Sequence, residues 1–214
     1  MILSLVEHAK GVLVVAGRTS GVQGNERLTA TTGLVLLVLL AVEGFTVLSV
    51  RGMFGVHVFV GLLLIPPIGL KLASTGYRFT RYYTGNRAYR QAGPPSPIPR
   101  TIAPILVLCT VTLFGTGVLL LLLGPQQRDT TRTIHTYAFF AWFVFMAVHL
   151  LTYVWRSPSL ALADVSSTGS ALRGRVTRES LVVGSVVLGV IAALVFLPLD
   201  ASWVQWLSLR HHGG

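Results

Sequence analysis

The sequence predicts an all-α polytopic membrane protein with five transmembrane helices, the first four of which form a bundle. Hydrophobic residues make up 52% of its 214 residues and charged residues only 11%, whereas about a quarter of the residues in a soluble domain are charged. The mean hydropathy is +0.70. Several apolar runs reach the roughly 18 to 20 residues that cross a bilayer. These runs leave no room for a separate soluble catalytic domain.

Each expected span lies on one apolar run, and the connections divide the chain into regions. Arg51-Gly52 forms a short connection after the first span, and Pro66-Pro67 is expected to kink the second. The expected spans are residues 28–50, 53–75, 101–123, 134–155 and 180–199. They define a cytoplasmic amphipathic N-terminal segment (1–27), a four-helix transmembrane bundle (28–155), a basic cytoplasmic loop (156–179), and a fifth transmembrane helix with an external C-terminal tail (180–214).

The basic residues predict the orientation of the spans. The segment from Arg78 to Arg100 holds five arginines and no acid, and the segment from Arg156 to Arg178 holds four arginines and one aspartate. With the basic N-terminal segment, they outnumber the basic residues on the other side. The positive-inside rule therefore places the N-terminus in the cytoplasm and the C-terminus outside. The net charge of +10 accordingly indicates contact with a lipid bilayer and not with nucleic acid.

Aromatic residues and the choice of basic residue extend this prediction. Lysine occurs only at Lys10 and Lys71, and this preference for arginine fits a GC-rich bacterial genome. We therefore expect a multi-pass protein of the bacterial cytoplasmic (inner) membrane. Aromatic anchors are expected at the inner boundary and at the outer boundary; they are Tyr82, Tyr83, Tyr153 and Trp155, and Trp203 and Trp206, respectively.

Ionisable side chains inside the spans are costly and are therefore functional candidates. Fourteen residues separate His135 from His149, and fourteen also separate His57 from Lys71. At about 100° and 1.5 Å per residue, this spacing returns to nearly the same helix face about 21 Å deeper. Because the second and fourth spans run in the same direction, His57 is level with His135 near the outer face. Lys71 is level with His149 near the inner face.

Histidines that face each other across a bundle can bind the iron of a b-type haem. Arg132 lies one turn before His135 and can reach a haem propionate, and Arg51 lies near the same end. The single cysteine, Cys109, excludes covalent Cys-x-x-Cys-His attachment, so any haem is bound non-covalently. Small residues that could leave space for it are Gly33, Gly44, Gly61, Gly69, Gly115 and Gly117.

The same residues also have simpler interpretations. A histidine at a helix end can be an interfacial polar residue. Glu43, in the first span, can orient a ligand imidazole or pair with an interfacial arginine. Lys71 can extend its ammonium toward the inner boundary.

His57, His135 and His149 in this arrangement resemble the histidines of the di-haem membrane cytochromes b. That group includes the N-terminal half of the cytochrome b of quinol-oxidising complexes and the cytochrome b subunits of formate dehydrogenases and hydrogenases. The resemblance covers the first four spans. It implies haem b with His57 and His135 as axial ligands at the outer level, His149 as an iron ligand at the inner level, and Arg132 and Lys71 within the cofactor site. The sequence departs from the family at Lys71, where a second-level histidine is expected, so the resemblance supplies only one histidine ligand, His149, for an inner haem.

Three classes of function remain. The resemblance implies electron transfer across the membrane or from a quinol, by a subunit with a redox partner more than by a stand-alone enzyme. A proton or ion pathway would use Glu43, Lys71 and the histidines. In a membrane anchor or assembly subunit, the histidines would only pack. The pairing by level favours the first class, because a relay would be spread through the membrane depth.

Overall fold

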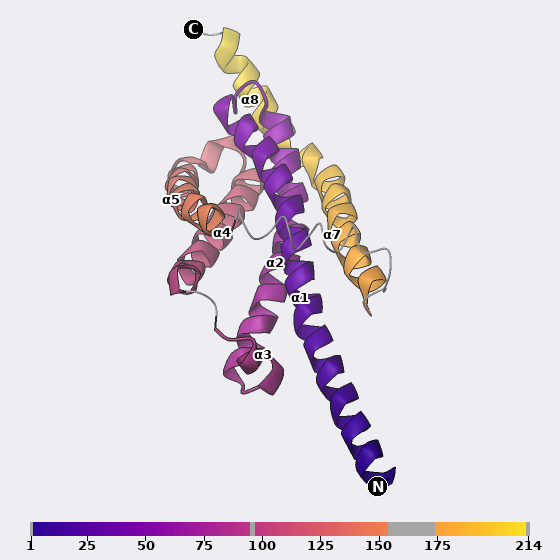
Figure 1. The fold of residues 1–214 in the computed structure, drawn as a ribbon. Coiled ribbons are helices and arrows are strands. Elements are labelled where there is room, and N and C mark those ends of the chain that lie inside the picture. The colour runs from indigo at the N-terminus through magenta and orange to yellow at the C-terminus, as the bar shows by residue number, and fades with distance from the viewer. Residues whose placement is uncertain (1, 95–96, 154–173, 213–214) are drawn as a thin grey trace.

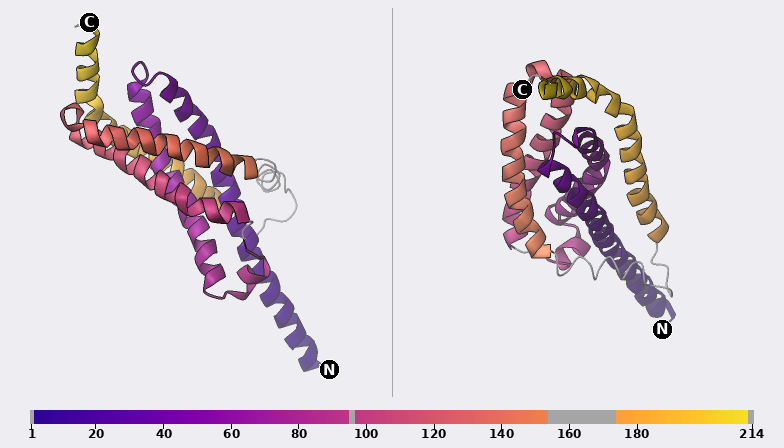
Figure 2. Two further views of the ribbon diagram at one scale, coloured as in Figure 1. Left: turned by 90° about the vertical axis from the view of Figure 1, so that its left-hand side faces the viewer. Right: turned by 90° about the horizontal axis from the view of Figure 1, so that it is seen from above.

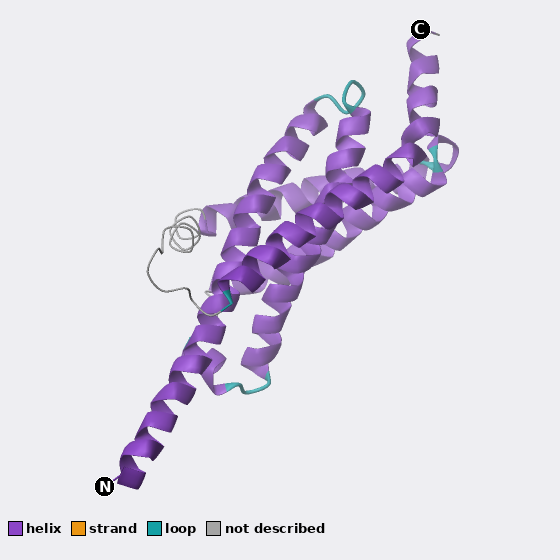
Figure 3. Cartoon of the chain, turned by 90° about the vertical axis from the view of Figure 1, so that its right-hand side faces the viewer, coloured by secondary structure: helices purple, strands orange, loops and turns teal. Residues whose placement is uncertain are grey.

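The computed structural model describes residues 2–94, 97–153 and 174–212, and within these ranges the side chains of residues 2–20, 97–99, 153 and 210–212 lie outside the described part. The described residues form helices and turns and contain no strand (Figure 3). Five helical segments are long and apolar enough to cross a membrane: Gly21–Leu48, Phe54–Tyr83, Arg100–Leu123, Asp129–Thr152 and Arg175–Leu209. The predicted all-α membrane protein with five spans is therefore confirmed.

Helix α1 (Ile2–Leu48) joins the expected N-terminal segment and the first span in one helix (Figure 1). No proline occurs before residue 66, so no strong helix breaker separates the two parts. The N-terminal segment is thus helical, but it continues α1 and does not form a second helix. Its amphipathic character involves side chains outside the described residues and stays a prediction.

Helix α2 (Phe54–Tyr83) continues well past the expected end at residue 75. Its last turns hold arginine, tyrosine and threonine, which are compatible with a helix. They are not apolar, so a span predicted from hydropathy ends before them. A turn at Gly85, with φ of +84°, leads into the short helix α3 (Arg87–Gln91), whose N-cap Asn86 accepts a hydrogen bond from the Tyr89 backbone N–H. Tyr89 is buried and packs edge-to-face on Tyr77, with ring centroids 6.0 Å apart.

Helices α4 (Pro97–Leu123) and α5 (Asp129–Tyr153) form an antiparallel hairpin. Gly124, with φ of +68°, and the 3-10 turn η1 (Pro125–Gln127) connect them. Within the hairpin, buried Trp142 donates a hydrogen bond from Nε1 to Thr110 Oγ1 at 3.0 Å. The hairpin meets α2 mainly through α4, so α5 packs chiefly on α4.

Helix α7 (Arg175–Phe196) packs extensively on α2. The sequence predicts a bundle of the first four spans only and does not predict this contact. Gly189 of α7 is buried, and a Cβ atom there would lie only 3.1 Å from the Leu63 carbonyl carbon. Pro67 has no N–H to donate to the carbonyl four residues earlier, which is that of Leu63. The carbonyl expected to be freed by the proline pair thus lies against the Gly189 backbone of α7. Fully buried Ala193, one turn later, packs in a cluster with Leu62 and Leu63.

The helices are arranged in three groups. The α1–α2 pair lies in the centre, the α4–α5 hairpin lies on one side and α7 on the other (Figures 1 and 2). The N-terminus, α3 and the start of α7 lie at one end, and the C-terminus lies at the other (Figure 1). The two termini therefore lie at opposite ends of the molecule, as five spans predict. The orientation of these ends in a membrane stays a prediction. Most of the loop 156–179, together with Trp155 and the side chain of Tyr153, lies outside the described residues.

The C-terminal end of the fold joins these groups through aromatic contacts. After the 3-10 turn η2 (Leu197–Asp200), helix α8 (Ala201–His212) begins. Trp203 is buried, contacts the Phe54 ring at 5.7 Å between centroids, and donates from Nε1 to Leu120 O at 3.1 Å. Trp206 stacks beneath the Arg128 guanidinium at 4.2 Å. Trp203 is therefore a packed residue, whereas an anchor at the lipid boundary was expected.

Candidate functional site

The first half of the candidate site lies within the α1–α2 pair, where His57 of α2 meets Glu43 of α1. His57 Nδ1 lies 2.8 Å from Glu43 Oε1 and 3.1 Å from Thr46 Oγ1. The Thr46 hydroxyl in turn lies 3.2 Å from Glu43 Oε2. Because an ionised carboxylate only accepts hydrogen bonds, Nδ1 carries the proton of a neutral His57 and donates it to Glu43. The Nε2 lone pair of His57 then remains available.

This contact resolves the two interpretations of Glu43. Glu43 lies against an imidazole and not against an interfacial arginine. A carboxylate that accepts from the far nitrogen of a histidine fixes the ring and its tautomer, and it increases the basicity of the other nitrogen. Gly61 faces the same carboxylate: a Cβ atom there would lie 3.7 Å from Glu43 Oε1.

The second half of the candidate site lies within the α4–α5 hairpin. His135 Nδ1 lies 3.1 Å from Leu113 O and 3.0 Å from Thr116 Oγ1, both on α4. A backbone carbonyl only accepts, so Nδ1 of a neutral His135 also carries the proton. A Cβ atom at Gly117 would lie 3.3 Å from His135 Cε1, so the glycine lets the ring lie close to α4.

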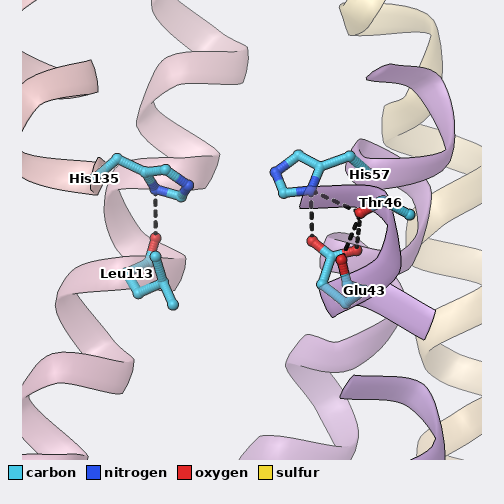
Figure 4. Close-up of polar contacts among 5 residues, drawn as sticks. All are labelled: Glu43, Thr46, His57, Leu113 and His135. Carbon is cyan, nitrogen blue, oxygen red and sulfur yellow. Dashed lines mark hydrogen bonds and ion pairs between the residues drawn. The ribbon is translucent and has the colours of Figure 1, made fainter. Parts of the chain in front are cut away.

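The imidazoles of His57 and His135 point toward each other from the two helix pairs (Figure 4). Each is held at Nδ1 by its own hairpin, and the remaining ring nitrogens are the ones available to a ligand. The level match that the sequence predicts for His57 and His135 is thus present in the fold.

The inner level that the sequence predicts comprises Lys71 of α2 and His149 of α5. Lys71 Nζ donates to Thr29 O of α1 at 2.5 Å. A Cβ atom at Gly33 would lie 2.8 Å from Nζ, so this glycine makes room for the ammonium. Lys71 therefore reaches across to α1 and does not extend along α2 toward the boundary.

A polar network surrounds Lys71 on the α1 side. Thr29 Oγ1 donates to Ser74 Oγ at 3.0 Å, and Ser74 Oγ donates to Lys71 O at 3.0 Å. Asn25 Nδ2 donates to Ser74 O at 3.1 Å. These bonds hold α1 and α2 in register and occupy the Lys71 ammonium, which weakens its candidacy as an iron ligand.

The remaining predicted residues have different surroundings. Arg132 and Arg51 are exposed, and the contact of Arg132 with a propionate stays a prediction. Of the six glycines expected to leave space, Gly33, Gly61 and Gly117 lie against polar side chains of the two levels. A Cβ atom at Gly44, Gly69 or Gly115 would have nothing within 4 Å.

Sequence reasoning missed the groups that hold the two rings, namely Thr46, Thr116 and the Leu113 carbonyl. A usable signal is the symmetry of each hairpin about its turn. Glu43 and His57 are equidistant from Val50, beside the first turn, and Gly117 and His135 are equidistant from Gln126 in η1. Residues placed symmetrically about a tight turn meet across an antiparallel helix pair.

A comparison with known proteins finds no protein family that matches the chain, and neither a curated protein nor a solved structure that matches it. The resemblance to the membrane cytochromes b accordingly rests on the histidines alone. Among the described residues, no group of three or more histidine, cysteine, aspartate or glutamate side chains could hold a bare metal ion. A haem iron differs in this respect, because the porphyrin supplies four ligands and the protein needs to supply only two.

Proposed function

We propose that this protein is an integral-membrane electron-transfer protein that binds haem b non-covalently between α2 and α5. The observation that carries the proposal is the pair of facing imidazoles, each with its Nδ1 held within its own helix pair. A haem supplies reversible one-electron chemistry at its iron.

The chain's own groups fit this cofactor. His57 and His135 would hold the haem iron through Nε2, and Glu43 and the Leu113 carbonyl orient the two rings through Nδ1. Helix α5 packs chiefly on α4, so a haem between α2 and α5 would not have to separate two closely packed helices. Arg132 is the residue we expect to pair with a propionate.

At the inner level we propose no second haem. His149 would need a second ligand from α2, where Lys71 stands. The Lys71 ammonium lies beside Gly33 and donates to Thr29 O, so it does not serve as that ligand. The expected stoichiometry is therefore one haem per chain, held at the outer level. A quinol or a redox partner subunit would exchange electrons with it, in keeping with the chain's expected place in the membrane.

The test is a visible spectrum of the full chain, expressed with adequate haem supply and purified in detergent. We expect a Soret band and an alpha band that sharpens on dithionite reduction. His57→Ala and His135→Ala should each remove the low-spin spectrum, and added imidazole should restore it by filling the vacated ligand position. His149→Ala, at the inner level, is the matched control and should keep the spectrum.

Two results would overturn the proposal. A folded, monodisperse protein without a Soret band would leave the anchor or ion-pathway classes as the better explanation of the histidines. Retention of the full low-spin spectrum in both His57→Ala and His135→Ala would refute the ligand assignment.

A further inference from the structure

Helix α2 is longer than a bilayer requires. Its 30 residues extend about 45 Å at 1.5 Å per residue, against an apolar core of about 30 Å. With its first turn at the outer level of His57, roughly the last ten residues of α2 extend through the headgroup layer at the opposite end. Helix α3 folds back beside them.

Among the described side chains, four arginines of the segment 78–100 are exposed at this end of the molecule; they are Arg81, Arg87, Arg90 and Arg100, which we term the arginine surface. Arg78, the fifth arginine of the segment, is already neutralised by Glu26 at 2.9 Å. No aspartate or glutamate occurs between residues 78 and 100. The arginine surface thus lacks acidic partners from its own segment.

The arginine surface is held in place by the fold. Arg81 lies over the Tyr77 ring at 5.9 Å and Arg100 over the Tyr83 ring at 5.8 Å. Arg87 and Arg90 lie three residues apart on α3, which buried Tyr89 fixes against Tyr77. A guanidinium that stacks on an aromatic ring keeps its N–H edge for a planar or phosphate acceptor. Little ordering is then required on binding.

We propose that the arginine surface binds the phosphate groups of anionic phospholipids in the leaflet on the N-terminal side. Charge complementarity favours this partner. Each arginine at the surface of an anionic leaflet increases the affinity for the membrane about fivefold. Exposed Tyr83 and Phe79 on the same turns suit the headgroup boundary. The surface lies at the end of the molecule away from His57 and does not depend on haem binding.

The test is native mass spectrometry of the full chain in detergent, titrated separately with phosphatidylglycerol and phosphatidylcholine. We expect preferential adducts with phosphatidylglycerol. The double variant Arg87→Gln/Arg90→Gln should weaken phosphatidylglycerol binding by on the order of tenfold or more, and Arg87→Lys/Arg90→Lys should keep most of it by retaining the charges. Arg51→Gln, which removes an exposed arginine at the opposite end, is the matched control and should bind as the wild type does.

Two outcomes would overturn the inference. Equal binding of the two lipids, or an unchanged preference in the double glutamine variant, would show that these arginines do not recognise the headgroup. Displacement of phosphatidylglycerol by an equal concentration of inorganic phosphate would identify a soluble anion as the ligand instead of a membrane lipid.

Discussion

Substitution of Gly189 by alanine tests the close contact between α7 and α2. The added methyl would lie 3.1 Å from the Leu63 carbonyl carbon and 3.2 Å from Leu63 Cα, and nearer still to the carbonyl oxygen. Carbon atoms in contact prefer about 3.5 to 4.0 Å. The obstacle is backbone, so no side chain can rotate away, and α7 must move from α2 or bend. The Leu63 carbonyl would also lose its contact with the Gly189 backbone.

The size of the effect follows from two opposing contributions. Overpacking of a close contact costs about 1 to 3 kcal/mol. Alanine in place of glycine in a helix interior returns up to about 1 kcal/mol. Gly184→Ala on the same helix is the matched control, because a Cβ atom there has nothing within 4 Å. The difference between the two variants removes the propensity contribution and should be about 1 to 3 kcal/mol.

The assay is equilibrium unfolding in mixed detergent micelles, followed by helical circular dichroism. We expect Gly189→Ala to be less stable than the wild type and Gly184→Ala to be as stable or slightly more so. If Gly189→Ala equals or exceeds Gly184→Ala in stability, the close α2–α7 contact at the Leu63 carbonyl is wrong.

Three further predictions concern the site and its surroundings. Glu43→Gln should weaken haem retention by about ten- to hundredfold through loss of the carboxylate behind the ligand, measured by haem transfer to an acceptor protein; Glu179→Gln is the control and should have no effect. Lys71→His supplies the histidine that the cytochrome b resemblance lacks, so the haem-to-protein ratio should rise from one to two per chain. An unchanged ratio in a folded variant would contradict the level match of Lys71 and His149. Trp203→Phe keeps an aromatic ring but removes the donor to Leu120 O, which should cost about 1 kcal/mol in the same unfolding assay; a loss of several kcal/mol would mean that ring shape matters more than the hydrogen bond.

The parts of the fold that the sequence predicts are those set by local composition. Five apolar runs predict five spans because no water is present in the bilayer to satisfy an exposed backbone, so each run must be a helix. The helix ends were less predictable. Helix α2 continues to Tyr83 and α7 begins at Arg175, since polar residues that favour helices extend each span beyond its apolar part.

Packing between spans was predictable only where a short turn fixes it. The α1–α2 turn brings Glu43 to His57 by symmetry. The sequence alone allows either an imidazole or an arginine as the partner of Glu43. The close packing of α7 on α2 was not foreseen. Its signal is the spacing of Ser185, Gly189 and Ala193 at intervals of four residues, which places small residues on one helix face. No local pattern indicates which of the other spans that face will meet.

The facing histidines depend on contacts that lie outside both helix pairs. Each imidazole is oriented within its own pair, so neither Glu43 nor Leu113 sets the separation of the rings. That separation depends on how the two pairs are joined, and Trp203 joins them close to the level of His57 and His135. Its ring contacts Phe54, three residues before His57, and its Nε1 bonds to Leu120, three residues after Gly117, which lies against His135. Both contacts lie about one helical turn from a histidine ring, so Trp203 of α8 restrains the two helix pairs near the site. The C-terminal helix, which the sequence predicts only as an external tail, is therefore part of what sets the distance across which the two histidines face each other.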